Sequence, residues 1–111
     1  MLPASARLRK SSEISAVMKS GTRFSAKLVV LHVASGPTEQ SKVAFAVGKN
    51  VGNSVIRHRV TRQLRHVVTP VLPRFPRGSH VVVRALPGAA TATFAQLTEN
   101  LEFALTKVPK S

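Results

Sequence analysis

The chain has 111 residues, which is enough for one domain with a modest core and too few for a second core. Lys and Arg total 17 and Asp and Glu total 4, so the net charge is +13, and nucleic acid is the first partner to consider for such an excess. The chain has no Cys, which excludes disulfide scaffolds and thiol nucleophiles, and its longest apolar run is five residues, far below the ~20 of a membrane span. Because the basic N-terminus also lacks the apolar stretch of a secretory signal, we expect a cytoplasmic protein with no membrane partner.

The N-terminal part of the chain predicts a basic, loosely ordered arm over residues 1–10 and then a short helix that runs to about Ser20. Ser11 or Ser12 is expected to cap the start of this helix, and Gly21 is expected to end it. Three apolar side chains share one face of the helix: Ile14, Val17 and Met18. This stripe predicts core packing, and the alternative is that part of it lines a ligand groove.

Three strands are predicted. Residues 27–34 are apolar and β-branched on both alternating sets, which is typical of a central strand. Residues 42–48 form a second strand and residues 80–85 a third. In the second strand the larger side chains alternate with Ala44 and Ala46; these larger side chains are Val43, Phe45 and Val47. We expect the large set to face the helices and the small set to leave a shallow, open face.

The central helix has the most informative pattern. Asn53 or Ser54 is expected to cap it, and the pair Thr69 and Pro70 to end it after about Val68. Its apolar positions lie within one quarter of the circumference: Ile56, Val60, Leu64 and Val67. Basic side chains occupy the opposite side and its border: Arg57, His58, Arg59, Arg62, Arg65 and His66. A merely solvated helix more often mixes Lys with Glu, whereas Arg can donate two hydrogen bonds at once to a phosphate, so we predict a nucleic-acid-binding face.

The C-terminal part completes the fold. Residues 70–78 contain three Pro and one Gly and predict a loop. Thr93 and Gln96 have the spacing of a capping box for a last helix over residues 94–107. The predicted buried face of this helix consists of Phe94, Leu97, Leu101 and Leu105. The order αββαβα predicts an α+β domain over residues 1–111, with helices packed on one small sheet.

A specific resemblance appears at residues 45–65. Gly48 to Asn53 joins the second strand to the central helix, and its two Gly and two Asn allow either a phosphate-holding loop or an ordinary tight turn. This loop contains Lys49, ends in Gly-Asn, and precedes an Arg-His-Arg-x-x-Arg-x-x-Arg helix. The segment resembles, without a gap, the signature of the bacterial ribonuclease P protein subunit. Leu8-Arg9-Lys10, the third strand and the closing helix extend the resemblance over nearly the whole chain.

The resemblance implies an α/β sandwich with a left-handed βαβ crossover and an accessory protein without catalytic residues of its own. Its implied partners are a catalytic RNA and precursor tRNA, and not DNA. The RNA removes the 5′ leader with Mg²⁺ that the RNA itself binds, and the protein alone binds no metal. The residues implied to contact the catalytic RNA are Lys49, Asn53, Arg57, His58, Arg59, Arg62 and Arg65. The residues implied to line a leader cleft between the first helix and the sheet are Arg9, Lys10, Ile14, Met18, His32 and Lys49.

Several positions depart from the family pattern. His58 replaces the usual Asn, and Thr61 stands where a basic residue is common. Ile14, Met18 and His32 stand where some relatives carry aromatic rings, so we expect weaker stacking on leader bases.

The residues themselves do not predict catalysis by the protein. The closest acidic pair in the sequence is Glu99 and Glu102, which is no carboxylate cluster for Mg²⁺. His58 and His66 could form an acid–base pair, but they lie two turns apart on an Arg-rich surface.

Three rival functions are a small ribosomal protein, a DNA-binding regulator and a basic membrane-surface protein. The first does not explain the signature segment, and the others lack a helix-turn-helix pair and a long amphipathic helix.

Overall fold

The computed structural model describes residues 4–37 and 39–109. Within these residues it has four strands and three α-helices, which are α1 Ser11–Ser20, β1 Thr22–Ser25, β2 Val29–Ser35, β3 Lys42–Ala46, α2 Ser54–Val68, β4 Ser79–Ala85 and α3 Phe94–Thr106. Three short 3-10 helices join them, namely η1 Ala4–Ala6, η2 Thr69–Arg74 and η3 Pro87–Ala90. The predicted α+β class is confirmed. No helix in the described part of the chain is long and apolar enough to cross a membrane.

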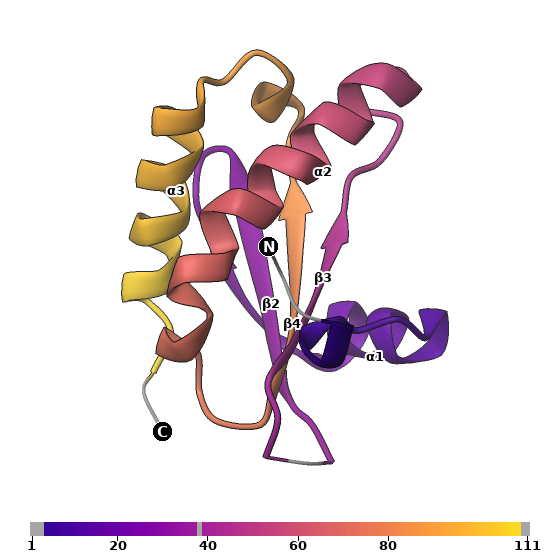
Figure 1. Ribbon diagram of the computed structural model, residues 1–111, viewed down its shortest axis with the longest axis vertical. Coiled ribbons are helices and arrows are strands. Elements are labelled where there is room, and N and C mark those ends of the chain that lie inside the picture. Colours follow the sequence, from indigo (N-terminus) through magenta and orange to yellow (C-terminus); the bar gives the residue numbers. More distant parts are fainter. Residues whose placement is uncertain (1–3, 38, 110–111) are drawn as a thin grey trace.

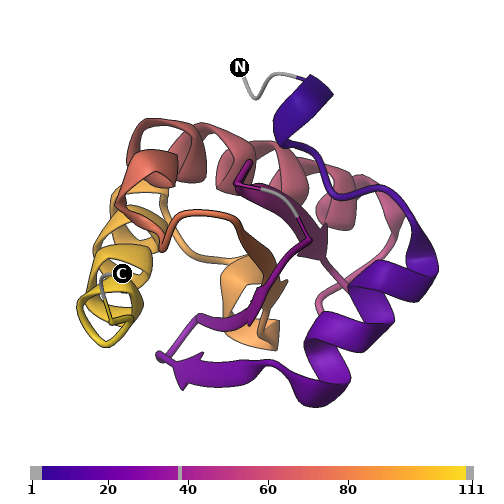
Figure 2. The same ribbon diagram turned by 90° about the horizontal axis from the view of Figure 1, so that it is seen from below.

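The four strands form one sheet in the order β1-β2-β4-β3, and only β3 and β4 run parallel. Helices α2 and α3 cover one face of the sheet, and α1 crosses the other face (Figure 2). Successive side chains of a strand point to opposite faces, so each strand contributes to both layers. Leu31 and Val83 pack in the cluster under α2 and α3, whereas Val82 packs in a smaller cluster under α1.

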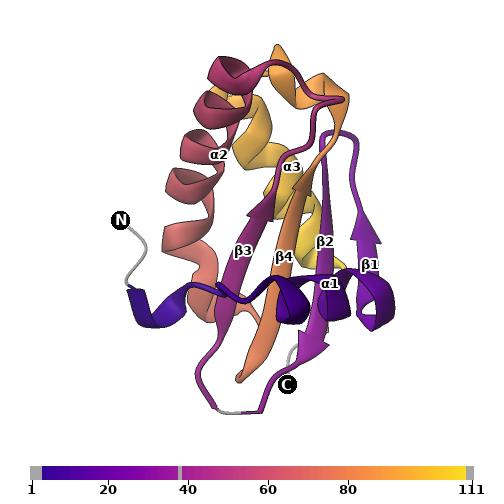
Figure 3. The same ribbon diagram turned by 90° about the vertical axis from the view of Figure 1, so that its right-hand side faces the viewer.

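The connection from β3 through α2 to β4 is left-handed. With both strands pointing up and α2 in front of the sheet, the chain moves from β3 on the right to β4 on the left (Figure 1), and Figure 3 shows α2 on that same side of the sheet. Parallel strands are joined by right-handed crossovers in about 98 % of cases. The left-handed crossover that the resemblance implied is therefore a distinctive feature, and it is present.

The predicted buried faces of α2 and α3 pack against the main core, with one exception. Val60 and Leu64 of α2 and Leu97 and Leu101 of α3 are fully buried against the sheet. Phe94 lies in the first turn of α3 and is 49 % exposed, so the prediction that it is buried is wrong. The buried face of α3 begins one turn later because the first turn lies at the end of the core.

The predicted helix ends are confirmed except at the start of α1; that helix ends at Ser20 with Gly21 as its C-cap, as predicted. The Asn53 side chain accepts a hydrogen bond from the backbone N–H of Ile56 at 3.0 Å. Thr93 and Gln96 form the capping box. At α1 the N-cap residue is Lys10, whose side chain makes no cap bond, so the prediction of Ser11 or Ser12 is wrong. The start of α1 is fixed instead by the segment that precedes it.

That segment differs from the loosely ordered arm that the composition predicted; residues 1–3 of the arm lie outside the described residues. Ala6 and Leu8 are buried, and the Leu8 N–H donates to the Val43 carbonyl at 2.9 Å. Arg7 and Val43 form an isolated parallel bridge. The segment is ordered because Leu8 fills the cluster under α1, beside Val17.

Strand β1 was not predicted. Its sequence is Thr-Arg-Phe-Ser, and only Phe24 packs against the main core. The apolar alternation is too weak to mark an edge strand of four residues. Gly21, the predicted end of α1, makes this tight junction possible, because a Cβ there would lie 2.4 Å from the Val17 carbonyl oxygen and 3.0 Å from that of Val33.

Candidate nucleic-acid interface

The outer side of α2 is a basic face. Because Val60, Leu64 and Val67 turn inward, the basic residues between them are directed to solvent or to the helix borders. His58 and Arg62 are exposed and Arg65 is half-buried. A shallow pocket of about 260 Å³ lies among four of these side chains, namely His58, Arg62, Arg65 and His66. The prediction that α2 presents several cations on one surface is confirmed.

This charge is not neutralised within the described part of the chain. The two ion pairs there join Arg74 to Glu102 and Arg77 to Glu39, and neither involves α2. The Arg74 Nη1 lies 2.8 Å from Oε2 of Glu102, which belongs to α3. Cations that gather without acidic neighbours repel one another, so α2 is suited to a polyanionic partner.

The arginines of α2 do not all extend into solvent. The Arg59 Nη2 donates to the backbone carbonyl of Ala90 in η3. Arg57 is half-buried, and its Nε has no hydrogen-bond partner among the described residues. The Thr61 hydroxyl donates to the Arg57 carbonyl at 2.8 Å. Arg59 is therefore exposed but held at the η3 border, whereas Arg62 is exposed without a partner among the described residues.

The loop before α2 places Lys49 at the end of β3 that is remote from α1 (Figure 3). Lys49 is exposed, and Val51, which is buried, anchors the loop to the core. Asn53 uses its side-chain oxygen to cap α2, so that oxygen is not available to a ligand. Arg9 and Lys10 are exposed at the start of α1. The structure thus does not gather the predicted leader-cleft cations, because Lys49 lies at one end of β3 and the other two lie near its other end.

On the face of the sheet beside α1, two polar side chains are neighbours in one row across the strands. Arg23 of β1 pairs with His32 of β2, which pairs with Val82 of β4, which pairs with Ala44 of β3. The next row contains Val30, Arg84 and Ala46. The small alanines of β3 lie on this face, as predicted, while Val43 and Phe45 pack under the helices. The expectation that this face is open is wrong at Ala44, which is buried in the cluster under α1.

His32, which lies in the row with Arg23, is a buried polar residue. It is 2 % exposed, and neither ring nitrogen has a hydrogen-bond partner among the described residues. Burial, and then the charges of Arg84 and Arg23, hold the pKa of His32 below its ordinary value. The imidazole is therefore neutral at pH 7. Its two arginine neighbours were not among the predicted site residues, although the alternation of β4 already placed Arg84 on the face opposite Val81 and Val83.

Ile14 and Met18 of α1 are half-buried at the border of this face. Both pack against the small cluster whose buried members include Val17 and Ala44. Of the two interpretations of the α1 stripe, core packing therefore holds for Val17. Ile14 and Met18 combine core contacts with partial exposure.

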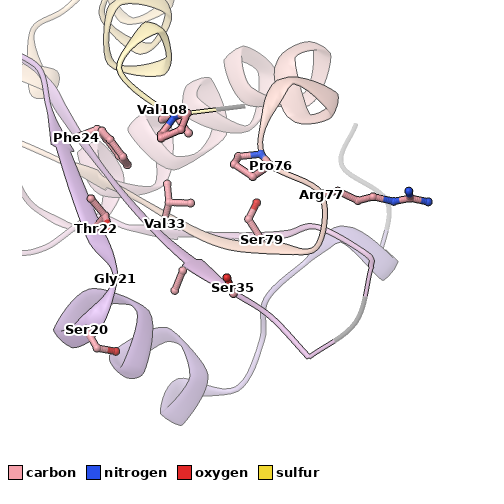
Figure 4. Close-up of a pocket in the computed structure, with 12 residues that line it drawn as sticks. Ser20, Gly21, Thr22, Phe24, Val33, Ser35, Pro76, Arg77, Ser79 and Val108 are labelled. Carbon is pink, nitrogen blue, oxygen red and sulfur yellow. The ribbon is translucent and has the colours of Figure 1, made fainter. Parts of the chain in front are cut away.

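Two other kinds of site were considered away from the basic face, a cavity and a metal site. A cavity of about 620 Å³ lies between β1, β2, the Pro76–Ser79 turn and the C-terminal end of α3 (Figure 4). Among its lining residues only Arg77 is charged, and its side chain points away from the cavity. In the described residues no group of three His, Asp or Glu side chains could hold a metal ion.

The chain is similar in sequence to known ribonuclease P proteins. The family model described as Ribonuclease P matches residues 2–109. The ribonuclease P protein component of Mycobacterium sp. (strain KMS) is 46 % identical over 107 residues, which is 95 % of this chain and 91 % of that protein. That of Acidothermus cellulolyticus is 40 % identical over 104 residues, covering 92 % of this chain and 87 % of that protein.

Two solved structures have the same fold. The RNase P protein of Staphylococcus aureus has a TM-score of 0.83 at 20 % identity and covers 92 % of this chain and 94 % of its own. The RNase P protein from Thermotoga maritima has a TM-score of 0.81 at 19 % identity, and the match covers 93 % of this chain and 97 % of that chain. At these identities the structures establish the shared architecture.

Proposed function

The chain belongs to the ribonuclease P protein family, and we propose that it is the accessory subunit that binds the catalytic RNA and the 5′ leader of precursor tRNA. Family membership implies an RNA partner in a ribonucleoprotein ribonuclease that processes tRNA. Within that complex this protein binds RNA and does not cleave it.

The observation that carries the proposal is the uncompensated basic face of α2. Two of its exposed members, His58 and Arg62, have no acidic partner in the described residues, and Arg65 beside them is half-buried. Guanidinium groups bind phosphates with two parallel hydrogen bonds, and each phosphate neutralised releases counterions from the RNA. We therefore assign the catalytic RNA to this face.

The leader is assigned to the face of the sheet beside α1. An extended strand lying along β3 would meet Lys10 near α1 and Lys49 at the other end of β3. Between them the face offers the half-buried Ala46 and Arg84, so the leader's phosphates have cationic partners while large rings for base stacking are few. This arrangement favours binding that depends on the length of the leader more than on its sequence.

Cleavage is assigned to the RNA with Mg²⁺. The acidic side chains of the described residues are dispersed, and Glu102 and Glu39 are engaged with arginines. Mg²⁺ requires oxygen ligands, which the phosphates of an RNA supply.

Reconstitution tests the proposed function. Purified protein, freed of RNA, is mixed with precursor tRNA and Mg²⁺, with and without the cognate catalytic RNA. We expect cleavage at the mature 5′ end only when the RNA is present, and faster cleavage with the protein than without it at low Mg²⁺. Cleavage by the RNA-free protein would overturn the proposal.

A further inference from the structure

We propose that a pocket at the free edge of β3, between the N-terminal segment and α2, binds one backbone phosphate of the catalytic RNA. This inference rests on the proposed function and adds a second binding element to it. The pocket has a volume of about 290 Å³.

The pocket is built where two segments remote in sequence meet. The N-terminal segment contributes Arg7 and Arg9, and α2 contributes Thr61 and Arg65. Apolar side chains form the remainder of the lining, namely Leu8, Ile14, Val43, Ala44 and Phe45. Figure 2 shows the N-terminal segment passing beside α2 before the chain enters α1.

The charges of the arginines that line the pocket suit it to bind an anion. Arg9 is exposed and Arg65 half-buried, and neither guanidinium makes an ion pair or hydrogen bond with another described residue. Both residues line the pocket, and a phosphate bound between them would neutralise charge that no described residue compensates.

The edge of β3 adds a backbone donor. The Val43 carbonyl accepts from Leu8, and residues two apart in a strand direct their backbone groups to the same edge, so the Phe45 N–H also points to the free edge. The bridge to the N-terminal segment is a single residue pair, Arg7 with Val43, after which the segment leaves the strand. The Phe45 N–H therefore opens onto the pocket that Phe45 lines.

We assign the pocket to the catalytic RNA because Arg65 belongs both to the pocket and to the basic face of α2. Arg65 lines both this pocket and the shallow pocket beside Arg62. An RNA backbone on α2 can thus continue over the edge of β3 to Arg9. Lys10, the next residue, does not line the pocket and keeps its assignment to the leader.

The test uses the full chain and the cognate catalytic RNA alone, without tRNA, over salt from about 50 to about 200 mM. We expect Arg9→Gln to lower the log–log salt slope by roughly 0.7–0.9, which is about a threefold smaller change in affinity over that range. Lys19→Gln, the control at an exposed cation of α1 that lines neither pocket, should leave the slope unchanged. Thr61→Arg should raise the slope by a similar amount, because it adds a cation to the pocket. Thermal unfolding verifies that each variant folds.

The outcomes separate this inference from the proposed function. If Arg62→Ala lowers the slope while Arg9→Gln does not, the pocket is not a phosphate site and the α2 assignment stands. The titration is repeated with precursor tRNA present; if Arg9→Gln acts only then, Arg9 contacts the leader and the inference is wrong. If neither variant changes the slope, the inference and the α2 assignment fail together.

Discussion

The Arg59 guanidinium donates a hydrogen bond to the backbone carbonyl of Ala90, thirty-one residues further along the chain. Ala90 ends η3, the 3-10 turn between β4 and α3, so this bond ties α2 to the connection that leads into α3. One arginine of the signature helix therefore has a structural partner within the described residues, whereas Arg62 has none.

This difference predicts unequal effects on stability. Arg59→Ala should lower the free energy of unfolding by about 0.5–1 kcal/mol, because it removes a hydrogen bond that is partly exposed to water. Arg62→Ala should change it by less than about 0.5 kcal/mol, since that side chain is solvated. Urea unfolding of both variants measures the difference. Equal losses would show that the Arg59 contact contributes nothing to the fold.

The basic face predicts a change in the salt dependence of RNA binding. Replacing Arg62 and Arg65 together with Ala should weaken binding to the catalytic RNA and lower the log–log salt slope by roughly 0.7–0.9 for each phosphate that the variant no longer neutralises. The apolar stripe of α2 is untouched, so the fold should be retained. Arg74→Ala is the control, because Arg74 is paired with Glu102 away from α2. Unchanged slope and affinity in the double variant would mean that this face is only solvated.

The buried imidazole of His32 predicts a loss of stability in acid. Its pKa in the folded protein lies below the ordinary value of 6.5, so below that pH the unfolded chain binds more protons than the folded one. The free energy of unfolding should therefore be fully retained above pH 6.5 and decrease as the pH falls through and below it, by at most about 1.4 kcal/mol per pH unit. Unfolding measured from pH 7.5 to about 5 gives this slope.

A pair of variants identifies the group responsible. His32→Phe should flatten the acid-side decrease, because it keeps a ring in the buried position and removes the titrating nitrogens. His58→Gln, on the exposed face of α2, should retain the decrease of the parent protein. A decrease that persists in His32→Phe would assign the acid sensitivity to another group.

Most local signals in the sequence were sufficient, although the capping signal at Ser11 or Ser12 was not. The Asn53 cap, the Thr93–Gln96 capping box and the two sides of α2 follow from spacings of three and four residues, which a helix converts directly into neighbours. The alternation of large and small side chains in β3 likewise predicted its two faces, because a strand has a period of two.

The remaining features depend on pairings between distant segments. Nothing near Leu8 in the sequence indicates that its N–H bonds to Val43, and that pairing creates the pocket at the edge of β3. The row from Arg23 to His32 requires the register of β1 on β2, and β1 itself was not predicted. These parts of the site are set by tertiary packing, which no local pattern encodes.

The leader assignment predicts dependence on length rather than sequence. Because few rings line the face beside α1, changing the leader sequence at fixed length should move the affinity of the reconstituted complex by less than about tenfold, which is 1.4 kcal/mol. Shortening the leader to one nucleotide should cost more, since fewer leader phosphates then lie along β3. Titration of leader variants against the complex measures both effects. Strong sequence preference without length dependence would place the leader elsewhere.

The half-buried position of Met18 predicts that leader binding can be strengthened. Met18 lies at the border of the cluster under α1, so Met18→Phe can present a ring to a leader base while keeping its core contacts. Stacking on an aromatic ring contributes about 1–3 kcal/mol per base, so precursor tRNA should bind at least about fivefold more tightly, and mature tRNA without a leader should bind as before. Val17→Phe is the matched control on the same helix, because Val17 is buried. A larger side chain there should cost about 1–3 kcal/mol of stability through overpacking and should not tighten leader binding. If Met18→Phe instead destabilises the protein as Val17→Phe does and leaves precursor affinity unchanged, Met18 is a core residue and the leader does not pass beside it.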